Sequence, residues 1–482
     1  MSGISNVTIR FCWVGLLVVT AACSSPPGFN DGGRKDGGEG EDCNATKKCA
    51  EGLFCLAGKC TGQFSFYDLD DAGPQMLYLS MALQADAGRV GIAYFAQVDA
   101  FGGTYGADGG LADGYRAADG GNTGNYEIRY VEWNNGVASP PQMIRTVQRV
   151  YGVSVAFQPN GEPAMAYLGG GADMSAYWYQ SDAVVAYRSG GNTWTENSVA
   201  TRSDQSPCGS PLDIGFLVGL FPSLVFDGPK AYLSWRDGHN GQFPQQDWAG
   251  SDLKISEGGP TAWTTRCQMS SGNIKYAYGA RTQMVMANGQ PAVVHDRAFG
   301  GADTPGKDIL FNRRQADGGW TNAVLAANSW PAVAPVLVIQ NTMSGGSVAW
   351  DPVEGYGIAA VEHSNDVLQY VRSANGTTWD SYLPVFGGGS GGWYPSLAMD
   401  PVNHEPAIAF YVCSKLTGIA EGNCLEQDDE LRIIQRIVST WRETLVDLEG
   451  GYLPKLGFFD TGKRVVAYRV PKSKKIRLAV ER

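Results

Sequence analysis

Apolar and polar residues alternate in a sequence motif that occurs seven times along this chain. Each copy is an alternating apolar run, a tight turn with Asn-Gly, Asp-Gly or Asp-Pro, and a second run rich in Ala, Val and Ile. The copies lie at residues 79–94, 153–167, 222–235, 283–295, 347–361, 395–411 and 454–468. Each predicts a β-hairpin, and their recurrence indicates a radial or stacked repeat architecture.

Each hairpin is followed by a third apolar strand, a turn rich in Gly and Asn, a Trp and a fourth strand. The clearest copies of this second half lie at residues 183–199, 309–325, 368–383 and 431–446, with looser ones at 253–267 and 128–143. Four strands per repeat form the blade of a β-propeller. We therefore predict an all-β, seven-bladed β-propeller of four-stranded antiparallel blades, with the Trp residues packed as wedges between blades.

The two ends of the repeat region suggest how the ring closes. The seventh repeat has a third strand at residues 476–480 and lacks a fourth, while residues 63–69 form a strand-like segment before the first repeat. A ring loses its edge strands only if its ends pair. We therefore predict that residues 63–69 complete the last blade of a propeller domain spanning 61–482.

The segments that join the turn to the Trp resemble the Asp-box of the sialidase/BNR-repeat superfamily, whose pattern is roughly S-x-D-x-G-x-T-W. The nearest matches are residues 373–379 (SANGTTW) and 189–194 (SGGNTW), both one residue short and without the Asp. The resemblance implies a propeller fold. Sialidases of that family have six blades, three arginines on the substrate carboxylate, a Tyr/Glu nucleophile pair and an acidic Asp. Seven repeats and the absence of an Arg-Ile-Pro start motif give no basis for carrying over a catalytic set.

Residues 1–22 predict a bacterial lipoprotein signal peptide. Arg10 precedes an apolar run at 11–19 that is too short to span a bilayer. The sequence TAAC at 20–23 then resembles a lipobox, although Thr20 replaces the usual Leu, and this implies that Cys23 becomes the lipidated first residue. Ser24 indicates the outer membrane of a Gram-negative cell, and several acyl chains on Cys23 would anchor the protein in the envelope. Ordinary secretory cleavage near Ala22 is the alternative.

Residues 23–42 continue as a Gly-rich, acidic and flexible linker behind the lipidated Cys23. No cofactor is predicted. The alternative is Ca²⁺ held by the acidic residues of 30–42, or a cation wrapped by the Gly- and Asp-rich loop 99–125.

The chain has ten cysteines, of which Cys12 lies in the signal and Cys23 is lipidated. The other eight can pair in an oxidising compartment. Residues 43–60 predict a Cys-rich module that two disulfides hold, with zinc as the alternative. It resembles the short Cys-rich modules found behind lipoprotein anchors. Its cysteines are Cys43, Cys49, Cys55 and Cys60, and three pairings are open, Cys43–Cys55 with Cys49–Cys60 among them. In the propeller, Cys413 is expected to pair with Cys424, and by elimination Cys208 with Cys267.

Loop lengths point to one functional face. The predicted turns between strands one and two, and between three and four, are short, whereas the loops between two and three are mostly long (96–125, 168–182, 236–252, 296–308 and 412–430). In a propeller these loops emerge on the same face as the blade-to-blade connections. Long, varied loops on a rigid scaffold tend to carry function. We therefore expect a binding surface on this face, over the axial channel.

The ends of the second strands lead to that face and carry aromatic and charged residues suited to a carbohydrate or a peptide. The candidate ligand-binding residues are Tyr94, Tyr167, Trp235, Arg236, Asp237, His295, Asp296, Arg297, His363 and Tyr411, with Glu362 and Arg469 beside them. The adjacent opposite charges of Arg236 and Asp237, and of Asp296 and Arg297, can perturb one another's pKa in a cleft. A purely structural role at the mouth of each blade is the alternative interpretation.

Charge and motif content exclude several classes of function. The net charge is −11 without a Lys/Arg stripe, so nucleic acid is a poor partner. No phosphate-binding or H-E-x-x-H motif is present, and the four histidines are spread over different blades, so no metal site is predicted. We predict a monomeric propeller, anchored in the envelope by lipid, that binds a glycan or an envelope protein without catalysis. The alternatives are a sialidase-like glycoside hydrolase or lyase, and a structural part of an envelope assembly.

Overall fold

The computed structural model describes residues 53–56, 59–73, 78–97, 126–147, 152–170, 181–201, 208, 218–237, 251–270, 276–299, 307–324, 346–362, 367–380, 383–386, 391–413, 429–470 and 472–482. The chain divides into two compact units, Met1–Thr61 and Gly62–Arg482. The predicted signal peptide and linker lie outside the described residues, as does most of the predicted Cys-rich module. There the structure has a two-stranded sheet of β1 (Leu53–Leu56) and β2 (Lys59–Gly62).

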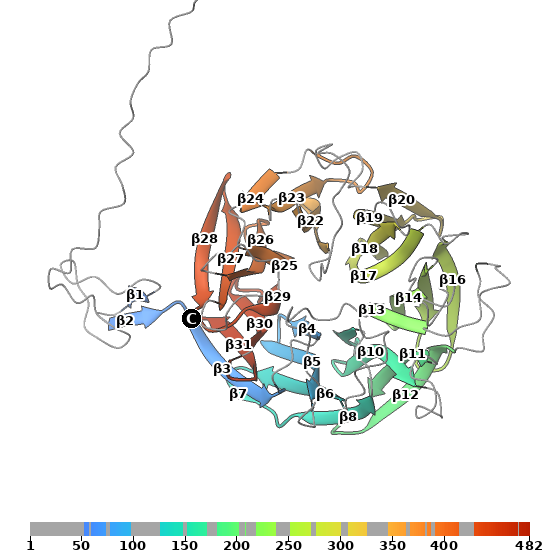
Figure 1. The fold of residues 1–482 in the computed structure, drawn as a ribbon, viewed down its shortest axis with the longest axis horizontal. Helices are drawn as coiled ribbons and strands as arrows, with labels where there is room; N and C mark the ends of the chain where they lie inside the picture. Colours follow the sequence, from blue (N-terminus) through green and yellow to red (C-terminus); the bar gives the residue numbers. More distant parts are fainter. Residues whose placement is uncertain are drawn as a thin grey trace, which may run out of the picture. The chain divides into compact units, whose positions relative to one another are not determined.

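The second unit is a β-propeller whose seven sheets surround one axis (Figure 1). The first blade contains β4 (Leu79–Gln84), β5 (Arg89–Gln97) and β6 (Tyr126–Asn134), with β7 (Val137–Ala138) and β8 (Gln142–Val147) both paired to β6. The second contains β9 (Val153–Phe157), β10 (Pro163–Gly170), β11 (Ser181–Arg188) and β12 (Trp194–Ala200). The third contains β13 (Val218–Asp227), β14 (Lys230–Asp237), β15 (Asp252–Gly258) and β16 (Trp263–Met269).

The remaining blades repeat this order. The fourth contains β17 (Tyr276–Ala287), β18 (Gln290–Phe299), β19 (Lys307–Arg314) and β20 (Trp320–Val324). The fifth contains β21 (Ser347–Asp351), β22 (Gly355–Glu362), β23 (Val367–Ser373) and β24 (Leu383–Phe386). The sixth contains β25 (Gly391–Met399), β26 (Pro406–Cys413), β27 (Asp429–Ile437) and β28 (Thr440–Asp447). The seven-bladed, all-β prediction is confirmed. Within the described ranges, no helix has the length and apolar character needed to cross a membrane.

The seventh blade joins the two ends of the propeller, as the sequence predicts. It contains β29 (Tyr452–Phe458), β30 (Arg464–Val470) and β31 (Lys475–Glu481), and its outermost strand is β3 (Phe64–Asp71). β3 runs antiparallel to β31, from Phe64 opposite Glu481 to Asp71 opposite Lys475. The ring is thereby closed by residues more than 400 positions apart, and β31 has a partner strand on both sides.

Tryptophans on or just before the fourth strands pack against the preceding blade, as predicted. Trp194 meets Tyr130 edge-to-face with ring centroids 5.4 Å apart, Trp379 meets Phe311 at 5.0 Å and Trp441 meets Tyr370 at 5.4 Å. At the seam Trp133, early in its repeat, packs on Tyr67 of β3 at 5.4 Å. These contacts bury large aromatic area between sheets and hold the spacing of neighbouring blades.

The turn before Trp379 is held by two polar side chains. The Asn375 Oδ1 accepts hydrogen bonds from the N–H groups of Thr377 at 2.8 Å and Thr378 at 2.9 Å, and the Ser373 hydroxyl donates to the carbonyl of Thr378 at 2.6 Å. The Asn375 amide oxygen therefore satisfies two backbone donors of this turn.

A repeated hydrogen bond joins six of the seven inner strands to the inner strand of the following blade. A Ser or Gln side chain on the first strand of one blade accepts the backbone N–H of the first strand of the following blade. The bonds are Ser80 to Val155 N (3.1 Å), Ser154 to Leu224 N (2.9 Å), Ser223 to Met284 N (2.9 Å), Gln283 to Val348 N (3.1 Å), Ser347 to Leu397 N (2.9 Å) and Ser396 to Leu456 N (2.9 Å). The innermost strands are the inner edges of their sheets, and this bond satisfies a donor there.

A six-residue phrase precedes this bond in four blades: GLFPSL at 219–224, GARTQM at 279–284, GWYPSL at 392–397 and GYLPKL at 451–456. Its first residue and its third both have positive φ, and the strand pairing shifts register across it. Gly219 has φ +102°, and a Cβ there would lie 2.7 Å from the Cα of Ala183 in the preceding blade. Glycine is therefore required where the inner strand bulges against its neighbour.

We expect Ser154→Ala to lower the free energy of unfolding by about 1–2 kcal/mol, because the buried N–H of Leu224 loses its acceptor. Chemical denaturation of the full-length chain measures this. Ser189→Ala is the matched control, since Ser189 is exposed in the turn between β11 and β12, and it should change the stability by less than about 0.5 kcal/mol. Equal effects of the two substitutions would contradict a structural role for the bond.

Candidate functional site

A cavity of about 510 Å³ lies among the first strands of the blades. Residues of all seven blades line it: 78–83 of the first, 152–157 of the second, 221–226 of the third, 281–286 of the fourth, Gly346 of the fifth, Tyr394 and Pro395 of the sixth, and Leu453 and Lys455 of the seventh. It is therefore the axial cavity of the propeller, and its volume lies in the range of small-ligand sites.

The direction of the inner strands shows which residues form each mouth of the axial cavity. Every first strand begins at the blade-to-blade connection, so it starts at the face that also carries the long loops predicted between strands two and three. Tyr78, Phe221, Arg281 and Tyr394 come at these starts, whereas Leu83 and Phe226 lie toward the opposite face. The loop-rich mouth is therefore the more aromatic and polar one. Most residues of the long loops themselves lie outside the described residues.

Lys455 occupies the position that carries Ser or Gln in the other six blades. Lys455 precedes Leu456, just as Ser396 precedes Leu397 and Ser80 precedes Met81. A lysine ammonium has three donors and no acceptor, so it cannot accept the N–H of Met81 in the first blade. The repeated inner bond is thus replaced at the seam by a half-buried cation that lines the axial cavity.

No hydrogen bond or ion pair joins the Lys455 ammonium to any residue that the structure describes. β4, β25, β26 and β30 pack against β29, and neither they nor β29 contain an Asp or Glu. Burial without a compensating charge lowers the pKa of Lys455 from 10.5 to about 8. The ammonium is still mostly protonated at neutral pH.

Arg281 is the second basic residue of the cavity, and its charge is compensated. It sits at the loop-rich mouth with φ +49°, and its guanidinium lies 3.3 Å from the Asp296 carboxylate. Among the described residues lining the cavity there is no Asp or Glu. Lys455 is therefore the uncompensated charge of the lining.

The residues predicted to bind a ligand lie one strand farther from the axis. Tyr94, Tyr167, Trp235, Arg236, Asp237, His295, Asp296, Arg297 and Tyr411 are on second strands, and all except the half-buried Arg297 are buried. His363 lies outside the described residues, and so does the Glu362 side chain. None of these candidates lines the axial cavity.

Each of the predicted aromatics is engaged inside the fold. Trp235 is 2% exposed and its indole N–H donates to the Ser256 hydroxyl at 2.9 Å. Tyr94 donates to Asp70 at 2.6 Å, and Tyr167 donates to Glu196. Burial raises the pKa of both tyrosines well above their usual value. Tyr411 packs between the rings of Trp393 and Tyr452. These side chains hold strands together in this structure and present little surface to a ligand.

The predicted charged residues are also used internally. The Arg236 guanidinium donates to the Ser251 hydroxyl at 2.7 Å. His295 is fully buried, its Nδ1 accepts the N–H of Gly279 at 3.1 Å, and burial lowers its pKa to about 4. The imidazole is therefore neutral at physiological pH and stabilises the bulge at the start of β17.

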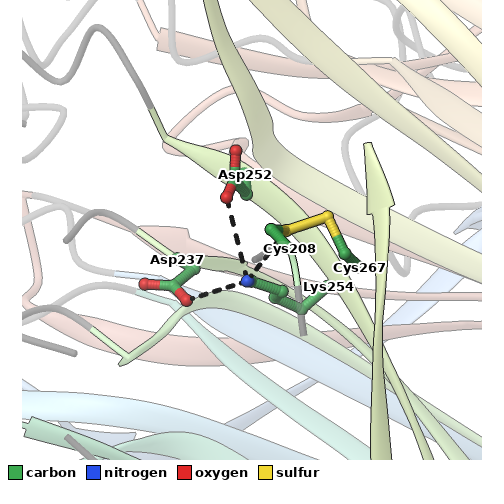
Figure 2. The surroundings of a disulfide bond; sticks show 5 residues. All are labelled: Cys208, Asp237, Asp252, Lys254 and Cys267. Carbon is green, nitrogen blue, oxygen red and sulfur yellow. Dashed lines mark hydrogen bonds and ion pairs between the residues drawn. A yellow bond between two sulfur atoms is a disulfide. The ribbon is translucent and has the colours of Figure 1, made fainter. Parts of the chain in front are cut away.

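Asp237 belongs to a buried cluster around a disulfide (Figure 2). Cys208 and Cys267 are bonded, as the sequence predicts, and the Lys254 ammonium lies 3.0 Å from the Cys208 sulfur. The same ammonium lies 3.4 Å from the Asp237 carboxylate and 3.8 Å from that of Asp252. Cys413 is also disulfide-bonded, whereas its predicted partner lies outside the described residues.

Cys208, Cys267 and Asp252 bring ligand-type atoms within 4.8 Å of one another, but the two sulfurs are bonded together and offer no thiolate to a metal ion. We read this cluster as a structural clamp on the third blade, in which the carboxylates compensate the Lys254 charge.

Sequence reasoning missed the cavity residues because it followed the charged ends of the second strands. The sequence did contain an indication of these residues, in the six-residue phrase described above. Aligning its four copies places Phe221, Arg281, Tyr394 and Leu453 in one column and the Ser, Gln and Lys residues in another. Lys455 is the member of the second column that departs from the pattern, and a departure from a structural repeat indicates another role.

No protein-family model matches the chain, and no curated protein matches it in sequence. Solved structures of similar fold include a Trypanosoma rangeli sialidase mutant displaying trans-sialidase activity (12% identity, TM-score 0.40), the NanB sialidase from Streptococcus pneumoniae (11%, 0.42) and an ulvan lyase of polysaccharide lyase family PL25 (13%, 0.48). They cover 72%, 88% and 87% of this chain.

The matches cover 55%, 71% and 95% of those proteins in the same order, so this chain spans just over half of the T. rangeli sialidase chain. At these identities the similarity is one of fold alone.

We expect Lys455→Ser to raise the free energy of unfolding by about 1–3 kcal/mol, because a serine can accept the N–H of Met81 and the substitution removes a desolvated charge. Lys463→Ser, an exposed lysine in the turn of the same blade, is the matched control and should be nearly neutral. Chemical denaturation at pH 7 compares the two. A loss of stability in Lys455→Ser would show that the lysine stem packs favourably at the seam.

The stability difference between the wild type and Lys455→Ser should depend on pH. The folded-state pKa of Lys455 is lowered to about 8 from 10.5, so between these values the unfolded chain binds more protons than the folded chain. The wild type therefore gains stability relative to Lys455→Ser as the pH rises from about 8 to 10.5, and the gap is constant below pH 7. Denaturation curves at pH 7 and pH 9.5 test this, and an unchanged gap would contradict an uncompensated Lys455.

Proposed function

We propose that this chain is a lipid-anchored protein of the bacterial cell envelope whose propeller binds a glycan without catalysing a reaction on it. The axial cavity carries the proposal: a hollow of about 510 Å³ that opens among aromatic residues and contains a cation without a partner among the described residues. Concave sites with apolar walls and a few placed polar groups are typical of small-ligand and cofactor binding.

The loop-rich mouth suits the apolar face of a sugar ring. Tyr78 is half-buried there, and its ring packs edge-to-face on Phe221 with centroids 5.9 Å apart. Tyr394 lies on the same rim and is held against Tyr452 at 5.7 Å. Rigid rings offer contact area at little cost in conformational entropy. Of the three rim aromatics, Tyr78 is the one with a partly exposed side chain.

A binding role agrees better with the lining than glycoside hydrolysis does. Hydrolysis by the usual routes needs two carboxyl groups about 5–9.5 Å apart on either side of the scissile bond. The described lining contributes basic, hydroxyl, aromatic and aliphatic groups. Two carboxylates on second strands are compensated: Asp296 lies 3.3 Å from Arg281, and Asp237 lies 3.4 Å from Lys254.

The envelope location rests on the sequence. The apolar run at 11–19 and the Cys23 lipobox support export and lipidation, and Ser24 supports the outer membrane. The Cys208–Cys267 disulfide is consistent with an oxidising compartment. The protein would then hold its propeller at the membrane surface, where glycans and envelope proteins are the available ligands.

We expect the full-length chain, purified in detergent, to bind a defined set of saccharides on a glycan array. Tyr78→Ala should weaken that binding about tenfold or more, because it removes the accessible ring of the rim. Phe66→Ala removes an exposed ring from the outermost strand β3, and it should leave binding unchanged. Thermal unfolding confirms that both variants are folded.

A blank array from folded wild type would overturn the glycan proposal and favour an envelope protein as the ligand. Release of reducing sugar or of unsaturated product from a bound polysaccharide would instead favour the hydrolase or lyase alternative. Equal loss in Tyr78→Ala and Phe66→Ala would place the binding site away from the axial cavity.

A further inference from the structure

We propose that the ligand of the axial cavity is an anionic saccharide carrying a carboxylate, such as a hexuronate, and that Lys455 binds this carboxylate. The inference rests on the proposed function, because it names the chemistry of the ligand at the same site. It assigns a ligand-binding role to a residue at a position that is structural in the other six blades.

Comparison of the seven repeats shows that Lys455 does not make the inter-blade hydrogen bond made by the Ser and Gln residues at the same position. Ser396 in the sixth blade and Ser80 in the first, the blades on either side of the seventh, each accept a backbone N–H of the next inner strand. Lys455 cannot accept the N–H of Met81, so the seam lacks the inner bond found between the other neighbouring blades. A substitution that gives up a favourable contact and places a charge in the interior needs a compensating function.

The surroundings of Lys455 leave its charge open to a ligand. The strands packed against β29 carry no carboxylate. Two arginines, Arg464 and Arg469, are the charged residues of β30. Arg464 is paired with Glu481 at 2.7 Å, and Arg469 donates to the carbonyl of Phe95. Buried ammonium groups are normally paired, and the axial cavity gives an incoming anion direct access to this one.

The size and lining of the cavity indicate a ligand larger than a simple anion. A halide or an acetate would fill a small part of about 510 Å³. The lining of the cavity is mixed: Met81, Leu453 and Tyr394 contribute hydrophobic surface, and serines contribute hydroxyl groups. A sugar acid combines the features that such a site selects: one carboxylate for the ammonium, hydroxyls for the serines that line the cavity, and C–H faces for the rings and methyl groups.

The experiment compares matched pairs of monosaccharides by isothermal titration of the full-length chain at pH 7 in a buffer free of carboxylates. The pairs are glucuronate with glucose, galacturonate with galactose, and mannuronate with mannose, and acetate serves as the anion without a ring. We expect wild type to bind at least one acid about ten- to a hundredfold more tightly than its neutral partner, as a hydrogen bond to a charged group implies.

Lys455→Met keeps the length of the side chain and removes its charge, so it should bring the ratio of acid to neutral affinity close to one. Lys455→Arg should keep most of the ratio, and Lys463→Met, at the exposed lysine of the same blade, should behave as wild type. Thermal unfolding of each variant verifies that it is folded before titration.

The outcomes separate this inference from the proposed function. Neutral and acidic sugars bound equally by wild type, or an unchanged ratio in Lys455→Met, would overturn the role of Lys455 and leave a glycan-binding propeller. Acetate bound as tightly as every sugar acid would show that the ring contributes nothing, which would overturn both the saccharide ligand and the glycan-binding function.

Discussion

The hydrogen bond that a Ser or Gln on six of the seven inner strands accepts from the next blade is the interaction on which this propeller depends. A blade by itself ends at the axis in an unpaired sheet edge, and seven such edges face one another there. A side-chain acceptor satisfies a donor of each edge and sets the height of one blade against the next, since Ser154 reaches Leu224 N only in one register. The bulges with positive φ before the bond, and the wedged tryptophans at the outer rim, can be understood as geometry that this register requires.

The seam between the seventh and first blades is organised differently, because the contacts that hold these two blades together are made by the outermost strand β3. β3 carries Asp70, which accepts hydrogen bonds from Tyr94 at 2.6 Å and from Arg129 at 2.8 Å in the first blade, and Tyr67 packs on Trp133 of that blade. With these contacts in place, the inner bond is dispensable at the seam. That is where a lysine stands in the Ser/Gln column, and it is the residue that we propose binds the ligand.

The fold was readable from the sequence because period-2 alternation and turn chemistry are local signals, and seven copies reinforce one another. Residues 63–69 could be assigned to the last blade because the first and last strands of the repeat region each lacked a partner, and pairing them with each other closes the ring. The ligand-binding residues could not be found in the same way. Trp235 and Arg236 have the composition of a site, but alternation does not reveal whether a strand is first or second from the axis, and in this fold the second is buried. Lys455 carried a readable signal only once the columns of the repeat were aligned by the structure.

The pairing of β3 with β31 has a consequence for how the protein is made. The strand that closes the ring leaves the ribosome before the first blade, and its partner β31 follows more than 400 residues later, after the other strands of the propeller. Until then β3 has no ladder to join, and the first six blades form a curved, open stack with exposed sheet faces. Such high contact order slows the final step and leaves the unfinished ring prone to association.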